Sequence, residues 1–140
     1  MIKEWTRDGF TVSTNKKKLD IELIHAYLSQ TYWAEKRAKK VVKKTIETSV
    51  CFGVYKGNAL IGFARVVTDF ATMAYLADVF ILEEFRGIGL GKFLMYCIMR
   101  HPEFTDIKRW LLLTQDAHGL YLQFGFQPIE EPERFMEIKF

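Results

Sequence analysis

The chain has few cysteines and no long apolar run. Its two cysteines, Cys51 and Cys97, lie inside apolar segments and match no disulfide or zinc spacing. No stretch approaches the roughly 20 apolar residues of a membrane span, and charged residues interrupt any signal-peptide pattern near the N-terminus. We therefore expect a cytoplasmic protein that binds no metal and does not enter a membrane.

Strong charge of one sign is also absent, since 20 lysines and arginines against 17 acidic residues give a net charge of +3. The basic residues gather in one segment, which contains Lys36, Arg37, Lys39, Lys40, Lys43 and Lys44. Such a segment is either the solvated face of a helix or a surface that binds nucleic acid. Aromatic residues do not interleave with it, and no nucleic-acid-binding motif is present. We favour the solvated face and keep a basic nucleic-acid-binding module as an alternative.

The length and composition are those of one ordinary domain. A chain of 140 residues, of which 49% are hydrophobic, is long enough to bury about two-thirds of its unfolded surface. Neither a repeat nor a linker nor a low-complexity segment divides the sequence. We expect residues 1–140 to form a single domain.

Apolar periodicity predicts strands and helices in turn along the chain. Strands are expected over residues 10–14, 50–55, 59–67, 73–82 and 109–114, with a last strand near 136–140. Helices are expected over residues 21–28, 34–48, 90–99 and 117–124. This order predicts an α/β protein built on a mixed sheet.

Alternate glycines join the expected strand 73–82 to the expected helix 90–99, in the sequence Arg86-Gly87-Ile88-Gly89-Leu90-Gly91. The first N–H groups of a helix lack partners and carry partial positive charge, and glycine lets an anion approach them. The segment therefore predicts a phosphate-binding turn. A Rossmann fingerprint would need glycine in place of Lys92, and a P-loop would need serine or threonine in place of Phe93. A glycine-rich turn without a ligand is the alternative.

A resemblance to a known family narrows the choice. Residues 86–91 resemble the acetyl-CoA-binding signature Gln/Arg-x-x-Gly-x-Gly/Ala of the GNAT acetyltransferase superfamily. Residues 117–126, Ala-His-Gly-Leu-Tyr-Leu-Gln-Phe-Gly-Phe, are similar to its later segment Ala-x-x-Leu-Tyr-x-x-x-Gly-Phe. The resemblance implies a mixed, mostly antiparallel central sheet flanked by about four helices. It also implies direct transfer of an acetyl group from acetyl-CoA to a primary amine in a ternary complex.

The same resemblance implies roles for single residues. The implied cofactor-binding residues are Val79, Ile81, Arg86, Gly87, Ile88, Gly89, Leu90, Gly91, Lys92 and Phe124. Among them, the backbone N–H groups of Val79 and Ile81 are expected to hold the pantetheine and the thioester carbonyl. Tyr121 matches the family's general acid, which protonates the departing thiolate; without the family, an aromatic residue at helical spacing is more often core. Thr114 stands where many members carry asparagine, which puts one pantetheine contact in doubt.

Asp78 is the leading candidate for the general base. It lies between apolar neighbours on its expected strand, where a carboxylate is costly unless it is paired or used. A structural partner of Arg65 or of a backbone amide is the alternative explanation. His118 is a weaker candidate, and a water-relayed base, common in the family, needs no side chain at all.

These sequence patterns do not identify the acceptor of the acetyl group. It is either a small-molecule amine or an amine of a protein or peptide, with Tyr32, Trp33, Asp69 and Phe70 as candidates to line its pocket. A non-catalytic CoA-binding sensor is a further alternative, although the presence of Tyr121 favours an enzyme. The oligomeric state is equally open, and a homodimer is compatible with the sequence.

Overall fold

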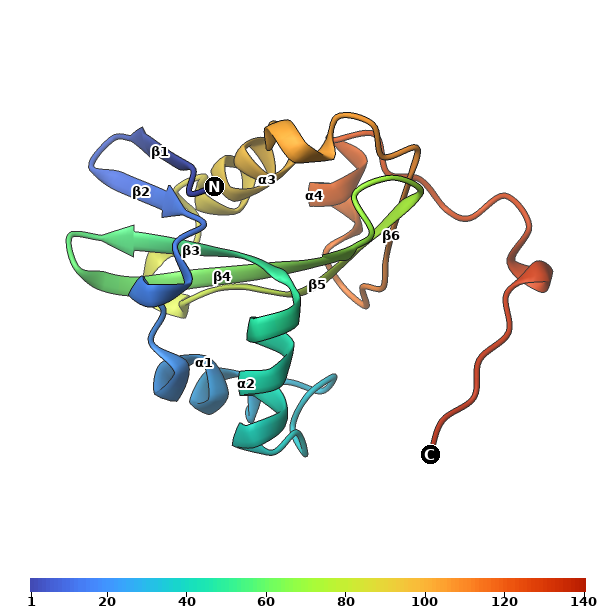
Figure 1. Cartoon of the computed structure of the whole chain (residues 1–140), viewed down its shortest axis with the longest axis horizontal. Coiled ribbons are helices and arrows are strands. Elements are labelled where there is room, and N and C mark those ends of the chain that lie inside the picture. Colours follow the sequence, from blue (N-terminus) through green and yellow to red (C-terminus); the bar gives the residue numbers. More distant parts are fainter.

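A computed structural model describes all 140 residues and contains a six-stranded sheet whose strands lie in sequence order (Figure 1). The strands are β1 (Glu4–Arg7), β2 (Phe10–Ser13), β3 (Val50–Lys56), β4 (Ala59–Thr68), β5 (Met73–Ile81) and β6 (Arg109–Leu112). Neighbouring strands run antiparallel, except that β5 and β6 are parallel. The predicted mixed, mostly antiparallel sheet is confirmed.

Helices cover both faces of this sheet (Figure 1). They are α1 (Ile21–Leu28), α2 (Lys39–Thr48), α3 (Leu90–Met99) and α4 (His118–Leu122). The helices α1 and α2 pack on one face, in a core that includes Ile24 and Phe63, and α3 and α4 pack on the other, in a core that includes Phe52 and Leu94. Because the central strands are buried on both faces, they read as nearly continuous apolar runs.

Helix α3 forms where its apolar period places it. The residues at the expected spacing, Leu90, Phe93, Leu94, Cys97 and Ile98, are all buried. Both cysteines are free and buried, and burial raises the pKa of Cys51 to about 11 and that of Cys97 to about 12. Each therefore stays a protonated, unreactive thiol at neutral pH.

The helix expected over residues 34–48 begins only at Lys39. The residues before it form a loop that runs back toward the sheet, where Trp33 and Arg37 bond to the carboxylate of Asp78 on β5. Thr31 steadies this loop, since its hydroxyl donates to the Leu28 carbonyl and accepts from the Ala34 N–H. Tertiary contacts to a buried charge thus override the local helical pattern.

Both ends of the chain differ from expectation. Strand β1 was not predicted, and the strand expected near 136–140 is wrong, because this segment is neither helix nor strand. Its apolar residues Met136 and Ile138 are 96% and 78% exposed. An alternating pattern becomes a strand only when a sheet edge pairs with it, and β6 remains the edge of this sheet.

Two kinds of feature are absent from the fold. No helix combines the length and the apolar character that crossing a membrane requires. No group of three or more His, Cys, Asp or Glu side chains is placed to hold a metal ion.

Candidate active site

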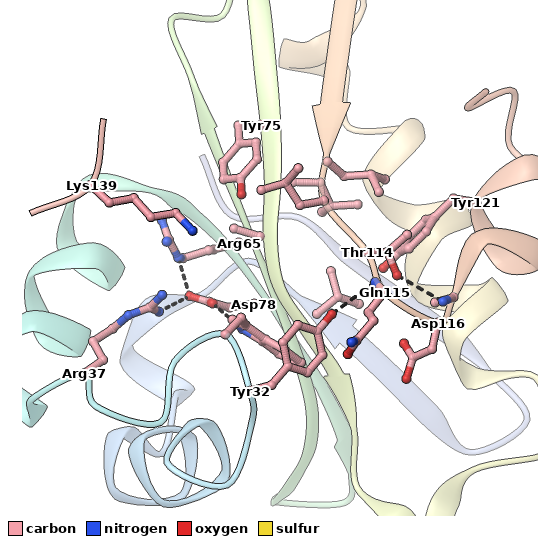
Figure 2. Close-up of a pocket in the computed structure, with 17 residues that line it drawn as sticks. Tyr32, Arg37, Arg65, Tyr75, Asp78, Thr114, Gln115, Asp116, Tyr121 and Lys139 are labelled. Carbon is pink, nitrogen blue, oxygen red and sulfur yellow. Dashed lines mark hydrogen bonds and ion pairs between the residues drawn. The ribbon is translucent and has the colours of Figure 1, made fainter. Parts of the chain in front are cut away.

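A cavity opens where the two parallel strands part. Strands β5 and β6 pair only where Met73–Leu76 of β5 lies beside Arg109–Leu112 of β6. Beyond Leu76, β5 continues to Ile81 without β6 beside it. The cavity holds about 740 Å³ (Figure 2). Its lining comes from residues 75–79 of β5, residues 112–117, Tyr121, Arg65 of β4, the loop residues Tyr32, Trp33 and Arg37, and Lys139. The free edge of β5 therefore faces open space that an extended ligand can enter.

The glycine turn lies at the end of the same strand. Gly87 and Gly89 have φ values of 82° and 87°, in the left-handed region that only glycine adopts readily. The first helical hydrogen bond of α3 runs from the Phe93 N–H to the Gly89 carbonyl, at 3.0 Å. The backbone N–H groups of residues 87–92 thus have no carbonyl partner, and they stand at the positive end of the helix. This geometry is that of an anion site.

Space beside the turn supports the same interpretation. A Cβ added to Gly87 or Gly89 would meet no protein atom within 4 Å. A second cavity of about 310 Å³ borders the turn, and its charged lining residues are two cations, Arg7 and Lys92, and one carboxylate, Asp8. The turn is therefore open to a bulky anion and is not packed against the fold.

The predicted cofactor side chains are used in different ways. Arg86 faces the fold, because its Nε donates to the Ile81 carbonyl at 2.9 Å and its guanidinium also bonds the Tyr27 hydroxyl. The side chain of Leu90 is buried, and that of Phe124 packs against the core under α3. Ile88 is 60% exposed at the tip of the turn. At residues 88 and 90 the backbone N–H is thus the group left for an anion.

Tyr121 lies on the opposite side of the large cavity from Arg65 (Figure 2). Helix α4 ends at Leu122. The turn after it contains Gly125 at φ 93°, and the Phe126 N–H donates to the Tyr121 carbonyl at 3.2 Å. The Phe126 ring packs edge-on against Tyr121. Burial, with smaller contributions from Asp116 and Tyr32, raises the pKa of Tyr121 to about 12. The phenol is therefore held in place and stays protonated at neutral pH.

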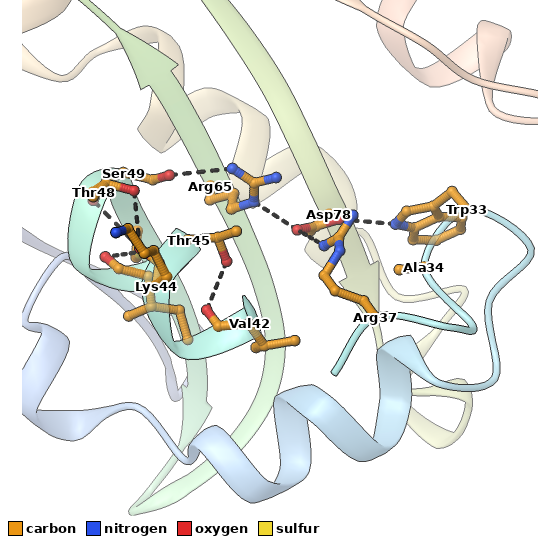
Figure 3. A network of polar contacts seen from close by, with 12 residues as sticks. Trp33, Ala34, Arg37, Val42, Lys44, Thr45, Thr48, Ser49, Arg65 and Asp78 are labelled. Atoms are coloured by element: carbon orange, nitrogen blue, oxygen red, sulfur yellow. Dashed lines mark hydrogen bonds and ion pairs between the residues drawn. The ribbon is translucent and has the colours of Figure 1, made fainter. Parts of the chain in front are cut away.

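Asp78 is the centre of a buried ion-pair cluster (Figure 3). Its Oδ1 accepts from the Trp33 indole at 2.9 Å. Its Oδ2 accepts from Arg37 at 2.7 Å and from Arg65 at 2.6 Å, and Arg65 also donates to the Ser49 hydroxyl at 3.2 Å. The partnership with Arg65 that the sequence left as an alternative is present. Proton uptake on Asp78 would therefore disrupt contacts with two guanidinium groups.

A β-bulge aims Asp78 at these partners. The register between β4 and β5 shifts between Phe63 and Arg65, and Asp78 has a φ of 53°. Before the bulge, Ala74 and Leu76 pack in the α3 core, whereas after it the odd-numbered Ile81 does. The extra residue reverses the alternation of the strand. Asp78 consequently points to the α1–α2 face instead of into the apolar core under α3.

The predicted acceptor residues divide into two pairs. Tyr32 and Trp33 line the cavity, and the Tyr32 hydroxyl accepts from the Gln115 N–H at 3.1 Å. Asp69 and Phe70 do not line it, because Asp69 binds the N–H groups of its own turn. Thr114 lines the cavity, but its hydroxyl accepts from the Ala117 N–H at 3.0 Å.

Sequence reasoning missed Arg37 and Lys139 as cavity residues. Arg37 looked like one more member of the basic segment, and nothing local distinguishes it from the exposed lysines beside it. Lys139 follows a strand-like pattern that forms no strand. No local signal identifies either residue, because the loop and C-terminal segment reach the cavity only through the tertiary fold.

These features define a class of protein that has a cleft between two separating parallel strands and, at the end of one strand, a glycine turn with unpaired backbone N–H groups. The chain belongs to the acetyltransferase (GNAT) family, whose sequence model matches residues 4–126. It is 44% identical to a GNAT-family protein of Xanthomonas campestris pv. campestris, with a TM-score of 0.92 over 96% of each chain. It is 28% identical to a protein of Gibberella zeae named for acetyltransferase activity, over 85% of this chain and 79% of that one. A GNAT-family structure from Elizabethkingia anophelis with acetyl-CoA bound shares the fold, with 17% identity and a TM-score of 0.67 over 89% of this chain and 80% of that chain.

Proposed function

We propose that residues 1–140 form one acetyl-CoA-dependent N-acetyltransferase domain. The observation that carries the proposal is the free edge of β5, which opens beside β6 and ends at a turn of unpaired N–H groups. An extended thioester with a pyrophosphate needs both parts, an edge along which to lie and a positive turn at its end. The acetyl-CoA bound in the related Elizabethkingia structure agrees with this choice of donor.

Acetyl-CoA supplies the acetyl group as an activated thioester. The N–H groups of residues 87–92 bind its pyrophosphate, with Lys92 adding a positive charge at the neighbouring cavity. The backbone of Val79 and Ile81 holds the pantetheine along the open edge, and an N–H there stabilises the negative charge that develops on the carbonyl oxygen. Arg86 stabilises the end of β5 through the hydrogen bond from its Nε to the Ile81 carbonyl.

Tyr121 acts as the general acid. The amine nitrogen of the acceptor attacks the thioester carbon, the new C–N bond forms and the C–S bond breaks. The Tyr121 hydroxyl gives its proton to the departing sulfur, and solvent returns a proton to the phenolate. A phenol that is buried and stays protonated retains this proton until the sulfur becomes negative.

Water, and not Asp78, removes the proton from the amine in this proposal. Both oxygens of Asp78 are already occupied by three donors, and the side chain is only 2% exposed. A proton on Oδ2 would displace a guanidinium from a buried ion pair. Asp78 instead holds Arg37 and Arg65 in place along the wall of the cavity.

Thiol release from acetyl-CoA, measured against a panel of amines and peptides, tests the proposal, with CoA affinity measured separately by calorimetry. An N-acetyltransferase binds CoA and releases thiol only when an acceptor is present, and mass spectrometry then finds the acetylated amine. CoA binding without turnover on any acceptor would indicate the sensor alternative. Absence of CoA binding would remove the assignment of the cleft.

A further inference from the structure

The wall of the cavity that faces Tyr121 is cationic. Arg37 comes from the loop before α2, Arg65 from β4 and Lys139 from the C-terminal segment, and all three line the cavity (Figure 2). Asp78 is the carboxylate that lies among them. Lys139 is paired with Glu137 at 3.5 Å. The two arginines against the single carboxylate of Asp78 therefore leave this wall with one uncompensated positive charge.

The unused donors of the arginines reinforce this charge. A guanidinium has five N–H donors in a planar fork. Arg37 uses one nitrogen on Asp78, and Arg65 uses one on Asp78 and one on Ser49. Their side chains are 21% and 12% exposed, so both are poorly hydrated. A ligand that brings a carboxylate would supply the acceptor oxygens that these donors lack.

The opposite side of the cavity has the other polarity. Asp116 lies there beside Tyr121 and Thr114 (Figure 2). A ligand with a negative group at one end and an amine at the other matches this distribution of charge.

We propose, on the basis of the proposed function, that the acceptor is a small amino-carboxylic acid whose carboxylate binds Arg37 and Arg65. The planar carboxylate fits the fork of a guanidinium with two parallel hydrogen bonds. The amine then points along the cavity toward the open edge of β5. Arg37 and Arg65 are the specificity-determining residues, and Asp78 positions both of them.

The experiment compares matched acceptors in the thiol-release assay. Free amino acids of acidic, basic, apolar and hydroxylated types are each tested beside their carboxamides and their decarboxylated amines. Loss of a charged hydrogen-bonded partner should lower kcat/KM by roughly 10- to 100-fold for the carboxamide and the simple amine. An aminoalkyl phosphonate is tested as a further acceptor, because it distinguishes recognition of a carboxylate from recognition of any anion.

Substitutions in the cationic wall test whether its arginines cause the preference for a carboxylate. Arg37→Gln should raise KM for the amino acid by roughly 10-fold or more, with little change for its carboxamide and none in CoA affinity. Arg37→Lys keeps the charge but not the fork, so it should recover part of the loss. Lys40→Gln removes an exposed cation of α2 outside the cavity, and it should leave every value unchanged.

The outcomes separate the two proposals. Equal turnover of amino acids, carboxamides and simple amines would overturn the carboxylate site and leave the acetyltransferase in place. A preference for the phosphonate, or an equal loss of amino acid and carboxamide turnover in Arg37→Gln, would also overturn it. CoA binding without thiol release on any acceptor would remove the proposed function and this inference together.

Discussion

The Tyr121 hydroxyl borders the cavity beside Asp116, and burial together with that neighbouring charge raises the pKa of Tyr121 to about 12. An acid with a raised pKa keeps its proton as the pH increases, so the protonated, active form persists at neutral and mildly alkaline pH. The raised pKa also makes Tyr121 a weaker acid than a free phenol. The position of the hydroxyl next to the sulfur must compensate for this mismatch, because the proton goes to a thiolate whose own pKa lies near 8.5.

Tyr121→Phe keeps the ring and its contact with Phe126 and removes only the hydroxyl. We expect kcat to fall by roughly 10- to 1,000-fold, with little change in CoA affinity or melting temperature. In the wild type, kcat should show no loss on the alkaline side from Tyr121 until the pH nears 12. Steady-state rates across pH test both statements. Wild-type kcat in the variant at every pH would leave the thiolate to take its proton from water.

Asp78→Asn separates a structural carboxylate from a general base. Asparagine tolerates the left-handed φ of 53° at this position, so the change mainly removes charge. The variant leaves Arg37 and Arg65 without their anion. Because both arginines keep some exposure, we expect a loss near the lower end of the range for breaking a buried pair, about 3 kcal/mol. Urea denaturation measures it.

A stable Asp78→Asn protein that has lost only kcat would assign the base to Asp78 after all. Arg65→Lys is the matched control, since it retains one charge in the pair but loses the Nε donor and the bond to Ser49. We expect it to be destabilised less than Asp78→Asn.

The apolar strand around Asp78 indicated that the carboxylate needs a partner, and Arg65 was named from the sequence. Arg37 and Trp33 were not, because they lie 41 and 45 residues away in the chain. A contact over such a distance depends on how a loop folds across the sheet. No local periodicity in the sequence indicates such a contact.

At the scale of the element, the turn before α3 combines a strained backbone with free space. Gly89→Val puts a branched side chain where φ is 87° and where a Cβ meets no protein atom within 4 Å. We expect a destabilisation of about 1–2 kcal/mol from the left-handed backbone. We also expect loss of CoA binding, since the valine side chain would fill the space of the pyrophosphate. Calorimetry with CoA measures the second effect and thermal melting the first.

Gly57→Val in the hairpin between β3 and β4 is the matched control. Its φ is 60°, its Cβ also meets nothing within 4 Å, and it lines neither cavity. The strain should therefore cost a similar stability, while CoA affinity stays at the wild-type value. If both variants bind CoA equally well, the turn does not hold the pyrophosphate.

Elements differed in how far the sequence predicted them. Helix α3 and strands β3 to β5 form close to where they were expected, because their own apolar residues make the core. The start of α2 was wrong because Trp33 and Arg37 bind a distant charge. The C-terminal strand was wrong because an alternating pattern does not specify which sheet edge, if any, accepts it.

At the scale of the whole molecule, one buried side chain connects the C-terminal end of α3 to the sheet. His101 follows α3, is 2% exposed and lies against Phe52 of β3 and against Phe104. Its Nδ1 accepts from the Glu103 N–H at 3.1 Å, which caps the short helical turn Pro102–Phe104. A protonated ring could not accept this bond, and it would bring charge into the core.

Burial lowers the pKa of His101 below its usual value of 6.5. The unfolded chain takes up a proton near pH 6.5, whereas the folded chain resists it until a lower pH. The stability that neutral His101 provides is therefore complete above about pH 6.5. It is lost as the pH falls through the folded-state pKa. We expect the free energy of unfolding to decline between pH 7 and pH 5.

Urea denaturation at several pH values, with the wild type and two variants, tests this expectation. His101→Asn can still accept from the Glu103 N–H but cannot titrate, so its stability should be lower at pH 7 and nearly independent of pH in this window. His118→Asn replaces an exposed histidine and should keep the wild-type slope. Glu4, whose pKa is lowered by Ser13 and Lys18, contributes only below about pH 4.5, outside the window. A slope that persists in His101→Asn would assign the acid sensitivity to other groups.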